Sequence, residues 1–114
     1  GKPNRSVKDA GREFLFYDLD DGLGIDATVA VKKGKVEYVS YLCNEDMKLI
    51  RHKFSQEKLE TRQMPVEQGP GYRTVLNEAL YESLGRAFVF ESKTGKVRAC
   101  IAWEPGKKFD ELGR

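Results

Sequence analysis

Two segments of the chain alternate apolar and polar residues next to a lysine–glycine turn, which is the pattern of a β-hairpin. Residues 25–31 alternate before the turn sequence KKGK, and residues 97–103 alternate after the turn sequence KTGK. Side chains two positions apart share one face of a strand, so each segment has one apolar face to bury. We therefore expect antiparallel hairpins over residues 23–42 and 87–104, with Gly34 at positive φ in the first turn.

A helical period lies between the two hairpins. From Tyr72 to Leu84 the apolar residues recur at i, i+3, i+4, i+7 and i+8, which predicts an amphipathic helix that ends at Gly85. The region Asn44–Gln63 also favours a helix, because Asn44 can cap it and apolar side chains follow on one face. An alternative is that Ser55 caps a shorter helix and that Lys48–Phe54 extends as a strand.

The N-terminal part adds one more strand. The aromatic run Glu13–Tyr17 predicts this strand, and Ser6 with Asp9 favours a short helical turn before it. Met64–Gly71 holds two prolines and two glycines and is expected to be a loop. Together the elements predict a single α+β domain over residues 1–114, with an antiparallel sheet of about five strands and one or two helices packed on one face.

Charge and cysteine content limit the classes of function. The chain has 20 basic and 18 acidic residues and a net charge of +2, so strong nonspecific binding to nucleic acid is not expected. Cys43 and Cys100 form no CxxC pair, and we expect two buried free thiols. No membrane-spanning run or signal peptide is visible. A reducing, cytoplasmic setting without a cofactor follows as the expectation.

An acidic segment is the first candidate site. Its members are Asp18, Asp20, Asp21 and Asp26. Clustered carboxylates can bind a divalent cation, although the spacing does not match an EF-hand loop because Gly22 stands at its fifth position. The same carboxylates can instead contact a protein partner through Coulomb attraction, and we expect Asp18, Asp20 and Asp21 to belong to a binding surface.

The segment GIDATVAVKKGKVEY resembles the active-site hairpin of the PD-(D/E)xK nucleases. That resemblance implies Mg²⁺ held by Asp26 and Glu37. The acidic segment adds Asp18 as a further candidate metal ligand. The family places a lysine two residues after the glutamate, and Val39 stands at that position here. A second local match is the triplet from Glu91 to Lys93, which does supply a lysine.

His52 is the only histidine and lies between Arg51 and Lys53. An imidazole can act as general acid or base, and flanking cations can hold phosphate, so a metal-independent ribonuclease of the toxin type is another hypothesis.

Aromatic residues alternate with cations near both hairpins. Tyr41 lies on the opposite strand face from Tyr38 and is the better candidate for an exposed stacking platform, whereas Trp103 is expected in the core. Three cations of the second hairpin complete this candidate binding surface, namely Lys93, Lys96 and Arg98.

The string GPGYRTVLNEAL resembles a helix segment of ribbon-helix-helix antitoxins, which implies a regulator or inhibitor of another macromolecule. No complete catalytic set is visible, so the sequence favours a small non-enzymatic module that acts through protein–protein interaction, as an immunity or antitoxin-type inhibitor or a phage or bacterial accessory factor. Nucleic-acid binding and the two nuclease chemistries remain alternatives. We expect a protein partner and keep nucleic acid as an alternative partner and a homodimer as an alternative assembly.

Overall fold

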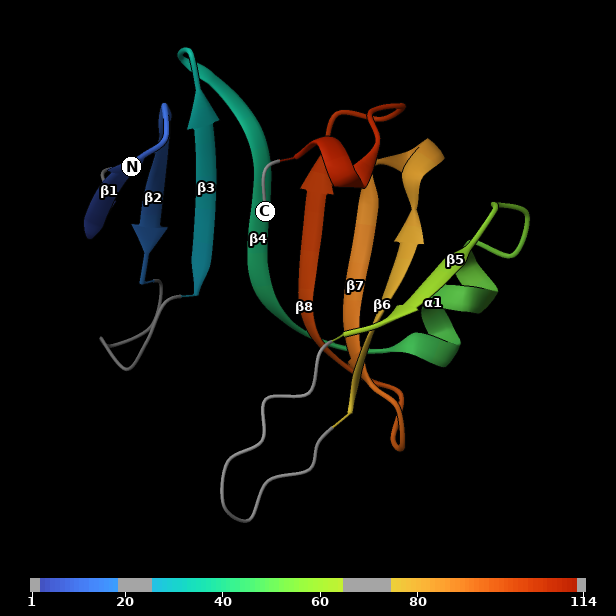
Figure 1. Ribbon diagram of the computed structural model, residues 1–114. Coiled ribbons are helices and arrows are strands. Elements are labelled where there is room, and N and C mark those ends of the chain that lie inside the picture. Colours follow the sequence, from blue (N-terminus) through green and yellow to red (C-terminus); the bar gives the residue numbers. More distant parts are fainter. Residues whose placement is uncertain (1–2, 19–25, 65–74, 113–114) are drawn as a thin grey trace.

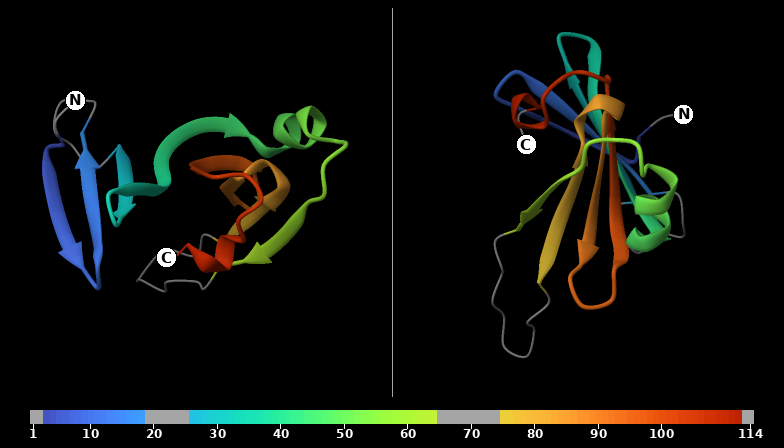
Figure 2. Two further views of the ribbon diagram at one scale, coloured as in Figure 1. Left: turned by 90° about the horizontal axis from the view of Figure 1, so that it is seen from above. Right: turned by 90° about the vertical axis from the view of Figure 1, so that its right-hand side faces the viewer.

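The computed structural model describes residues 3–18, 26–64 and 75–112. Within these ranges the chain forms one antiparallel sheet of eight strands in the order β1-β2-β3-β4-β8-β7-β6-β5 (Figure 1). The strands are β1 (Arg5–Asp9), β2 (Arg12–Tyr17), β3 (Ala27–Lys32), β4 (Lys35–Asp46), β5 (Glu60–Gln63), β6 (Leu76–Tyr81), β7 (Arg86–Glu91) and β8 (Lys96–Trp103). The long strand β4 joins the N-terminal strands to the remaining four and bends as it does so (Figure 2).

The predicted α+β class with about five strands is wrong. The described residues form eight strands, and their only α-helix is α1 (Met47–Lys53). Two of the unpredicted strands, β1 and β5, are short and mostly polar, and β1 is exposed along its whole length. Because neither strand has an apolar face to bury, neither leaves an alternating pattern in the sequence.

The predicted helix from Tyr72 to Leu84 is also wrong. Strand β6 (Leu76–Tyr81) and a 3₁₀ turn, η1 (Glu82–Leu84), occupy its described part, and residues 72–74 lie outside the described ranges. The consecutive residues Ala79, Leu80 and Tyr81 are each at most 1% exposed, and they divide between two buried clusters on opposite faces of the sheet. A strand buried on both faces has a continuous run of apolar residues in its sequence. Such a run also contains the i, i+3, i+4 spacing of an amphipathic helix.

Each face of the sheet is covered over part of its width. On one face, called here the helix face, Met47 and Ile50 of α1 pack against a cluster that includes Phe88. On the other, called here the tail face, the C-terminal 3₁₀ turn η2 (Phe109–Glu111) and Leu112 pack against a cluster that includes Trp103. Figure 2 shows α1 and η2 on opposite sides of β6–β8. Trp103 is 5% exposed, which confirms its predicted place in the core.

The predicted hairpins are confirmed within the described residues. β3 and β4 meet at the turn with Gly34 at φ 76°, and β7 and β8 pair as expected. The aromatic run before them forms β2. The predicted helical turn at Ser6 and Asp9 is wrong, because both residues lie in β1 and the chain reverses at Ala10 and Gly11, which both have positive φ.

Only part of the predicted helix Asn44–Gln63 forms. α1 begins after Asp46, whose Oδ1 accepts a 2.8 Å hydrogen bond from the Lys48 N–H and so caps the helix in place of Asn44. The alternative that Lys48–Phe54 extends as a strand is wrong, and Ser55 caps no helix.

The expectation of two free thiols is wrong as well. Cys43 on β4 and Cys100 on β8 form a disulfide, so the described residues contain no free cysteine. The expectation of a reducing, cytoplasmic setting loses the support that free thiols gave it. In the described part of the chain no helix has the length and apolar character needed to cross a membrane.

Candidate functional site

One half of the sheet has an apolar face that no described helix covers. This half, called here the wing, consists of β1, β2, β3 and residues 36–42 of β4. Directly opposed residues of antiparallel strands point to the same side of the sheet. Tyr41 pairs with Cys100, which belongs to the helix-face cluster, so Tyr41 points to the helix face. Register and alternation then identify the other wing residues on that face. These residues are Leu15, Tyr17, Ala27, Val29, Val31, Val36, Val39 and Tyr41. We call them the wing patch.

The wing patch is arranged in rows across three strands. Leu15, Val29 and Val39 form one row, and the next row along the strands holds two tyrosines, Tyr17 and Tyr41, on either side of a small alanine. Aliphatic side chains thus form the centre of the patch, and phenol rings form one end of it.

Exposure distinguishes the wing patch from the two buried clusters. Val36 is 62% exposed and Tyr41 is 40% exposed, whereas the other members are half-buried. No wing-patch residue belongs to either buried cluster. Helix α1 lies over the other half of the sheet (Figure 2). Soluble proteins seldom leave a contiguous apolar surface of this kind unless something binds to it.

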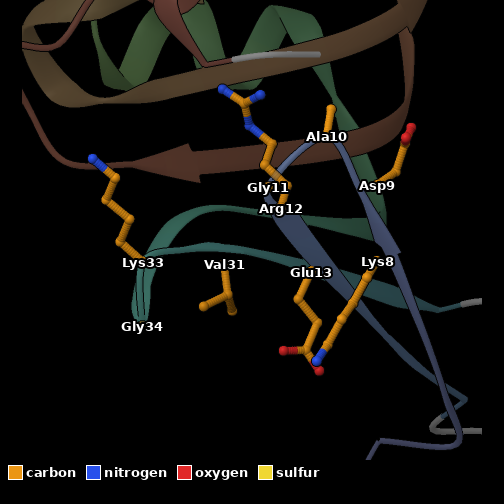
Figure 3. Close-up of a pocket in the computed structure, with 9 residues that line it drawn as sticks. All are labelled: Lys8, Asp9, Ala10, Gly11, Arg12, Glu13, Val31, Lys33 and Gly34. Atoms are coloured by element: carbon orange, nitrogen blue, oxygen red, sulfur yellow. The ribbon is translucent and has the colours of Figure 1, made fainter.

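Charged residues surround the hairpin-turn end of the wing. Figure 3 shows a shallow hollow there, with Lys8, Glu13 and Val31 directed to one side of the sheet and Asp9 and Arg12 to the other. This division follows from the alternation of side chains along β1 and β2. The wing patch therefore has an ionic rim at this end.

A basic surface lies at the same end of the molecule. The end of β3, the turn and the start of β4 contribute Lys32, Lys33 and Lys35, and Lys107 lines the same hollow. Glu37 also lies there, but Arg12 neutralises it through an ion pair with a nitrogen–oxygen distance of 3.3 Å. The hollow thus holds four lysines and two carboxylates, Glu37 and Glu111, on a chain whose net charge is only +2.

The structure does not bring Asp26 and Glu37 together. Asp26 precedes β3, where its carbonyl accepts a 2.9 Å hydrogen bond from the Leu42 N–H. Glu37 lies at the other end of the hairpin, beside Tyr38, which pairs with Ala30. Four residues of extended strand separate Asp26 from Ala30, which is roughly 13 Å. Among the described residues no three His, Cys, Asp or Glu side chains are grouped as metal ligands.

Several predicted site residues do lie at one end of the sheet. Asp26 is next to Ala27, which pairs with Tyr41, and Tyr41 pairs with Cys100, two residues after Arg98. Arg98 donates to the Glu91 carboxylate at 2.6 Å. Two other predicted cations, Lys93 and Lys96, are exposed near the β7–β8 turn.

The remaining predicted residues fall in three places. Asp18 follows β2, and its N–H donates to Asn4 Oδ1 at 2.8 Å. Asp20 and Asp21 lie outside the described residues. His52 is exposed on α1, and the guanidinium of the neighbouring Arg51 lies 5.5 Å from the Phe90 ring centre.

Sequence reasoning missed the wing patch as a site. Each of its strands was visible as an alternating or aromatic segment, but a predicted helix was expected to cover the sheet. The alternation identified the apolar face, and only the fold shows that no described helix covers it.

Comparisons with protein-family models, with curated proteins and with solved structures find no match to this chain.

Proposed function

We propose that the chain is a non-enzymatic module that binds a protein partner through the wing patch. The observation that carries this proposal is an apolar surface formed by three adjacent strands and left open by every described helix, with Val36 62% and Tyr41 40% exposed. An inhibitor or accessory subunit that occupies part of another macromolecule needs a surface of this kind.

The composition of the patch suits a protein partner. Tyrosine contributes a large rigid ring with one polar end, and tyrosines dominate the energetics of many interfaces. Ala27 lies between Tyr17 and Tyr41 in one register row, so its small side chain leaves room between the two rings for an apolar side chain of the partner. Charges at the rim, such as Lys8 and Glu13, can orient the encounter.

The test compares lysine substitutions inside and outside the patch. Val36→Lys and Tyr41→Lys place a cation in the proposed interface, and Leu49→Lys is the matched control because Leu49 is 69% exposed on α1, outside the patch. Each purified variant is used as bait, and any captured protein is then purified and titrated against all baits.

A partner that binds the wild-type chain and the Leu49→Lys control with equal affinity, and the two patch variants at least about tenfold more weakly, supports the proposal. Equal affinity for all four baits refutes it. Circular dichroism spectra and melting temperatures that match across the set show that the patch substitutions have not unfolded the chain.

The lysine hollow favours nucleic acid as a second candidate partner. Lys33 and Lys35 lie at the turn and can contact neighbouring phosphates, whereas Lys107 in the same hollow is already paired with Glu104 at 3.3 Å. A labelled single-stranded oligonucleotide should then bind at low salt and dissociate as salt rises, and Lys33→Glu should weaken binding. Lack of binding by the wild-type chain at low salt removes this candidate.

A further inference from the structure

The outer edge of the sheet is an open strand with a self-complementary sequence. Among the described residues β1 pairs only with β2, and it is the last strand in the sheet order (Figure 1). An edge strand offers unpaired N–H and C=O groups to another strand. We propose that β1 of one copy pairs antiparallel with β1 of a second copy about a two-fold axis at Val7, which makes the chain a homodimer with one continuous sheet.

Charge complementarity supports the second copy as the occupant. In this register Arg5 lies opposite Asp9 of the other copy, and symmetry repeats the pair on the other side of the axis. Val7 lies opposite its own counterpart. All three residues share the tail face, because they pair with Phe16, Arg12 and Phe14 on β2 in alternating positions. Opposite charges on directly opposed positions stabilise antiparallel strands.

Within one copy these two charges are too far apart to pair. Arg5 and Asp9 are four residues apart on an extended strand, roughly 13 Å. The guanidinium of Arg5 lies 4.9 Å from the Phe16 ring centre. No ion pair joins Asp9 to another residue in the described ranges. Arg12, the register partner of Asp9 on β2, is held by Glu37, so the dimer gives Asp9 a cation of its own and gives Arg5 a carboxylate.

A row of apolar side chains across the tail face also ends at Val7, the position of the proposed two-fold axis. Trp103, Tyr38, Ala30, Phe14 and Val7 are successive register partners from β8 to β1 on the tail face. The row is buried at Trp103 and ends at Val7, which is 44% exposed. Pairing of Val7 with its counterpart continues the row into the second copy and removes this exposed surface from water.

Other registers are less favourable. With a two-fold axis perpendicular to the sheet, the tail faces of both copies lie on the same side of the joined sheet. Opposed residues must then belong to the same face, which holds only in registers where the axis passes through a residue and its own counterpart. An axis at Lys8 sets two lysines opposite each other, and an axis at Ser6 sets Asp9 opposite Pro3, so that no opposite charges pair. The axis at Val7 alone pairs all five residues of β1.

The opposite edge of the sheet is a weaker candidate. Among the described strands β5 also pairs on one side only, but Arg62, the only cation of β5, is held within the chain by Glu60 and by Asp110 of η2. Dimerisation at β1 does not depend on the proposed partner site, because it uses strand-edge groups and the tail face, whereas the wing patch lies on the helix face.

The test uses charge reversal with a built-in rescue. Arg5→Asp sets a carboxylate opposite Asp9 of the other copy, and Asp9→Arg sets a second guanidinium opposite Arg5, so each single variant turns two attractive pairs into two repulsive ones. Sedimentation equilibrium should show each single variant dimerising about tenfold more weakly than the wild-type chain, or not at all. Lys8→Gln is the control on the same strand and should dimerise like the wild-type chain.

Rescue separates pairing from general charge effects. The double variant with Arg5→Asp and Asp9→Arg restores both pairs and the net charge, so it should dimerise like the wild-type chain. A mixture of the two single variants should form a heterodimer, because both opposed pairs are then opposite in sign. Thermal unfolding of each variant checks that the monomers remain folded.

Two results would overturn the proposal. One is a wild-type chain that remains monomeric up to millimolar concentration. The other is a mixture of the two single variants that associates no better than either variant alone.

Discussion

Cys43 on β4, the residue directly after the wing, is bonded to Cys100 on β8 with a Cα–Cα distance of 6.1 Å. Tyr41, two residues before Cys43, is the direct register partner of Cys100, and the register shifts between Leu42 and Glu45. Both cysteines belong to the helix-face cluster or pack against it. The covalent link therefore lies at the border between the covered and the open parts of that face.

Reduction of this disulfide should lower the free energy of unfolding. The bond closes a loop with a sequence separation of 57 residues, and restriction of the unfolded chain by such a loop contributes about 4 kcal/mol. Urea unfolding with and without dithiothreitol measures the loss. The Cys43→Ala/Cys100→Ala variant is the control, since its stability should not respond to dithiothreitol. A wild-type chain equally stable in both conditions would contradict the prediction.

Gly85 should tolerate no side chain. Its φ is 64°, and a Cβ there would collide with the carbonyl oxygen of Trp103, whose N–H donates to the Gly85 carbonyl at 2.9 Å. Gly85→Ala should therefore cost at least about 2 kcal/mol of stability, from backbone strain together with displacement of β8.

Gly34→Ala is the matched control for backbone strain alone. Its φ is 76°, but a Cβ there meets nothing within 4 Å, so the loss should be about 1 kcal/mol. Thermal or urea unfolding of both variants measures the difference. Equal losses would show that the contact with Trp103 is relieved at no cost.

The parts of the fold that the sequence predicted are those with a repeating local signal. The hairpin turn at Gly34 and the strand pair β7–β8 followed from alternation next to a glycine turn. The strand β6 did not follow, because burial on both faces removes the polar positions that separate period 2 from period 3.6. The spacing of Ala79 and Leu80 fits either structure.

The candidate sites were harder to predict because they depend on register. Asp26 and Glu37 are close in the sequence, yet the hairpin places them at opposite ends. Cys43 and Cys100 are far apart in the sequence, yet the pairing of β4 with β8 brings them together. Contacts between distant strands leave no periodic pattern in a single sequence, so the open face of the wing and the disulfide both had to be observed.

The cap of α1 should contribute measurably to stability. Asp46 Oδ1 accepts the Lys48 N–H at 2.8 Å and satisfies one of the free donors in the first turn of a short helix. Asp46→Ala should cost about 1 kcal/mol, and Asp46→Asn should retain most of that stability. Urea unfolding measures both. An Asp46→Asn variant as unstable as Asp46→Ala would show that charge, rather than the hydrogen bond, is responsible.

Acid should weaken the attachment of η2 to β5. Arg62 donates two hydrogen bonds to Asp110, with nitrogen–oxygen distances of 2.6 and 3.1 Å, and these hydrogen bonds lower the pKa of Asp110 below its ordinary value of 3.8. Because the pKa is lower in the folded state, the contribution to stability is complete above pH 3.8 and is lost as the pH falls from 3.8 through the folded-state value. Both side chains are partly exposed, at 33% and 69%, so the effect should be small.

Asp110→Asn isolates this contribution. The wild-type chain should be more stable than Asp110→Asn at neutral pH, and the difference should shrink as the pH falls below 3.8, since protonation then removes the same carboxylate charge in the wild-type chain. Glu111→Gln, at the exposed neighbouring position, is the control and should leave the acid profile unchanged. Urea unfolding across the acid range measures all three profiles. A difference between the wild-type chain and Asp110→Asn that stays constant with pH would mean that the ion pair with Arg62 does not hold η2 against the sheet.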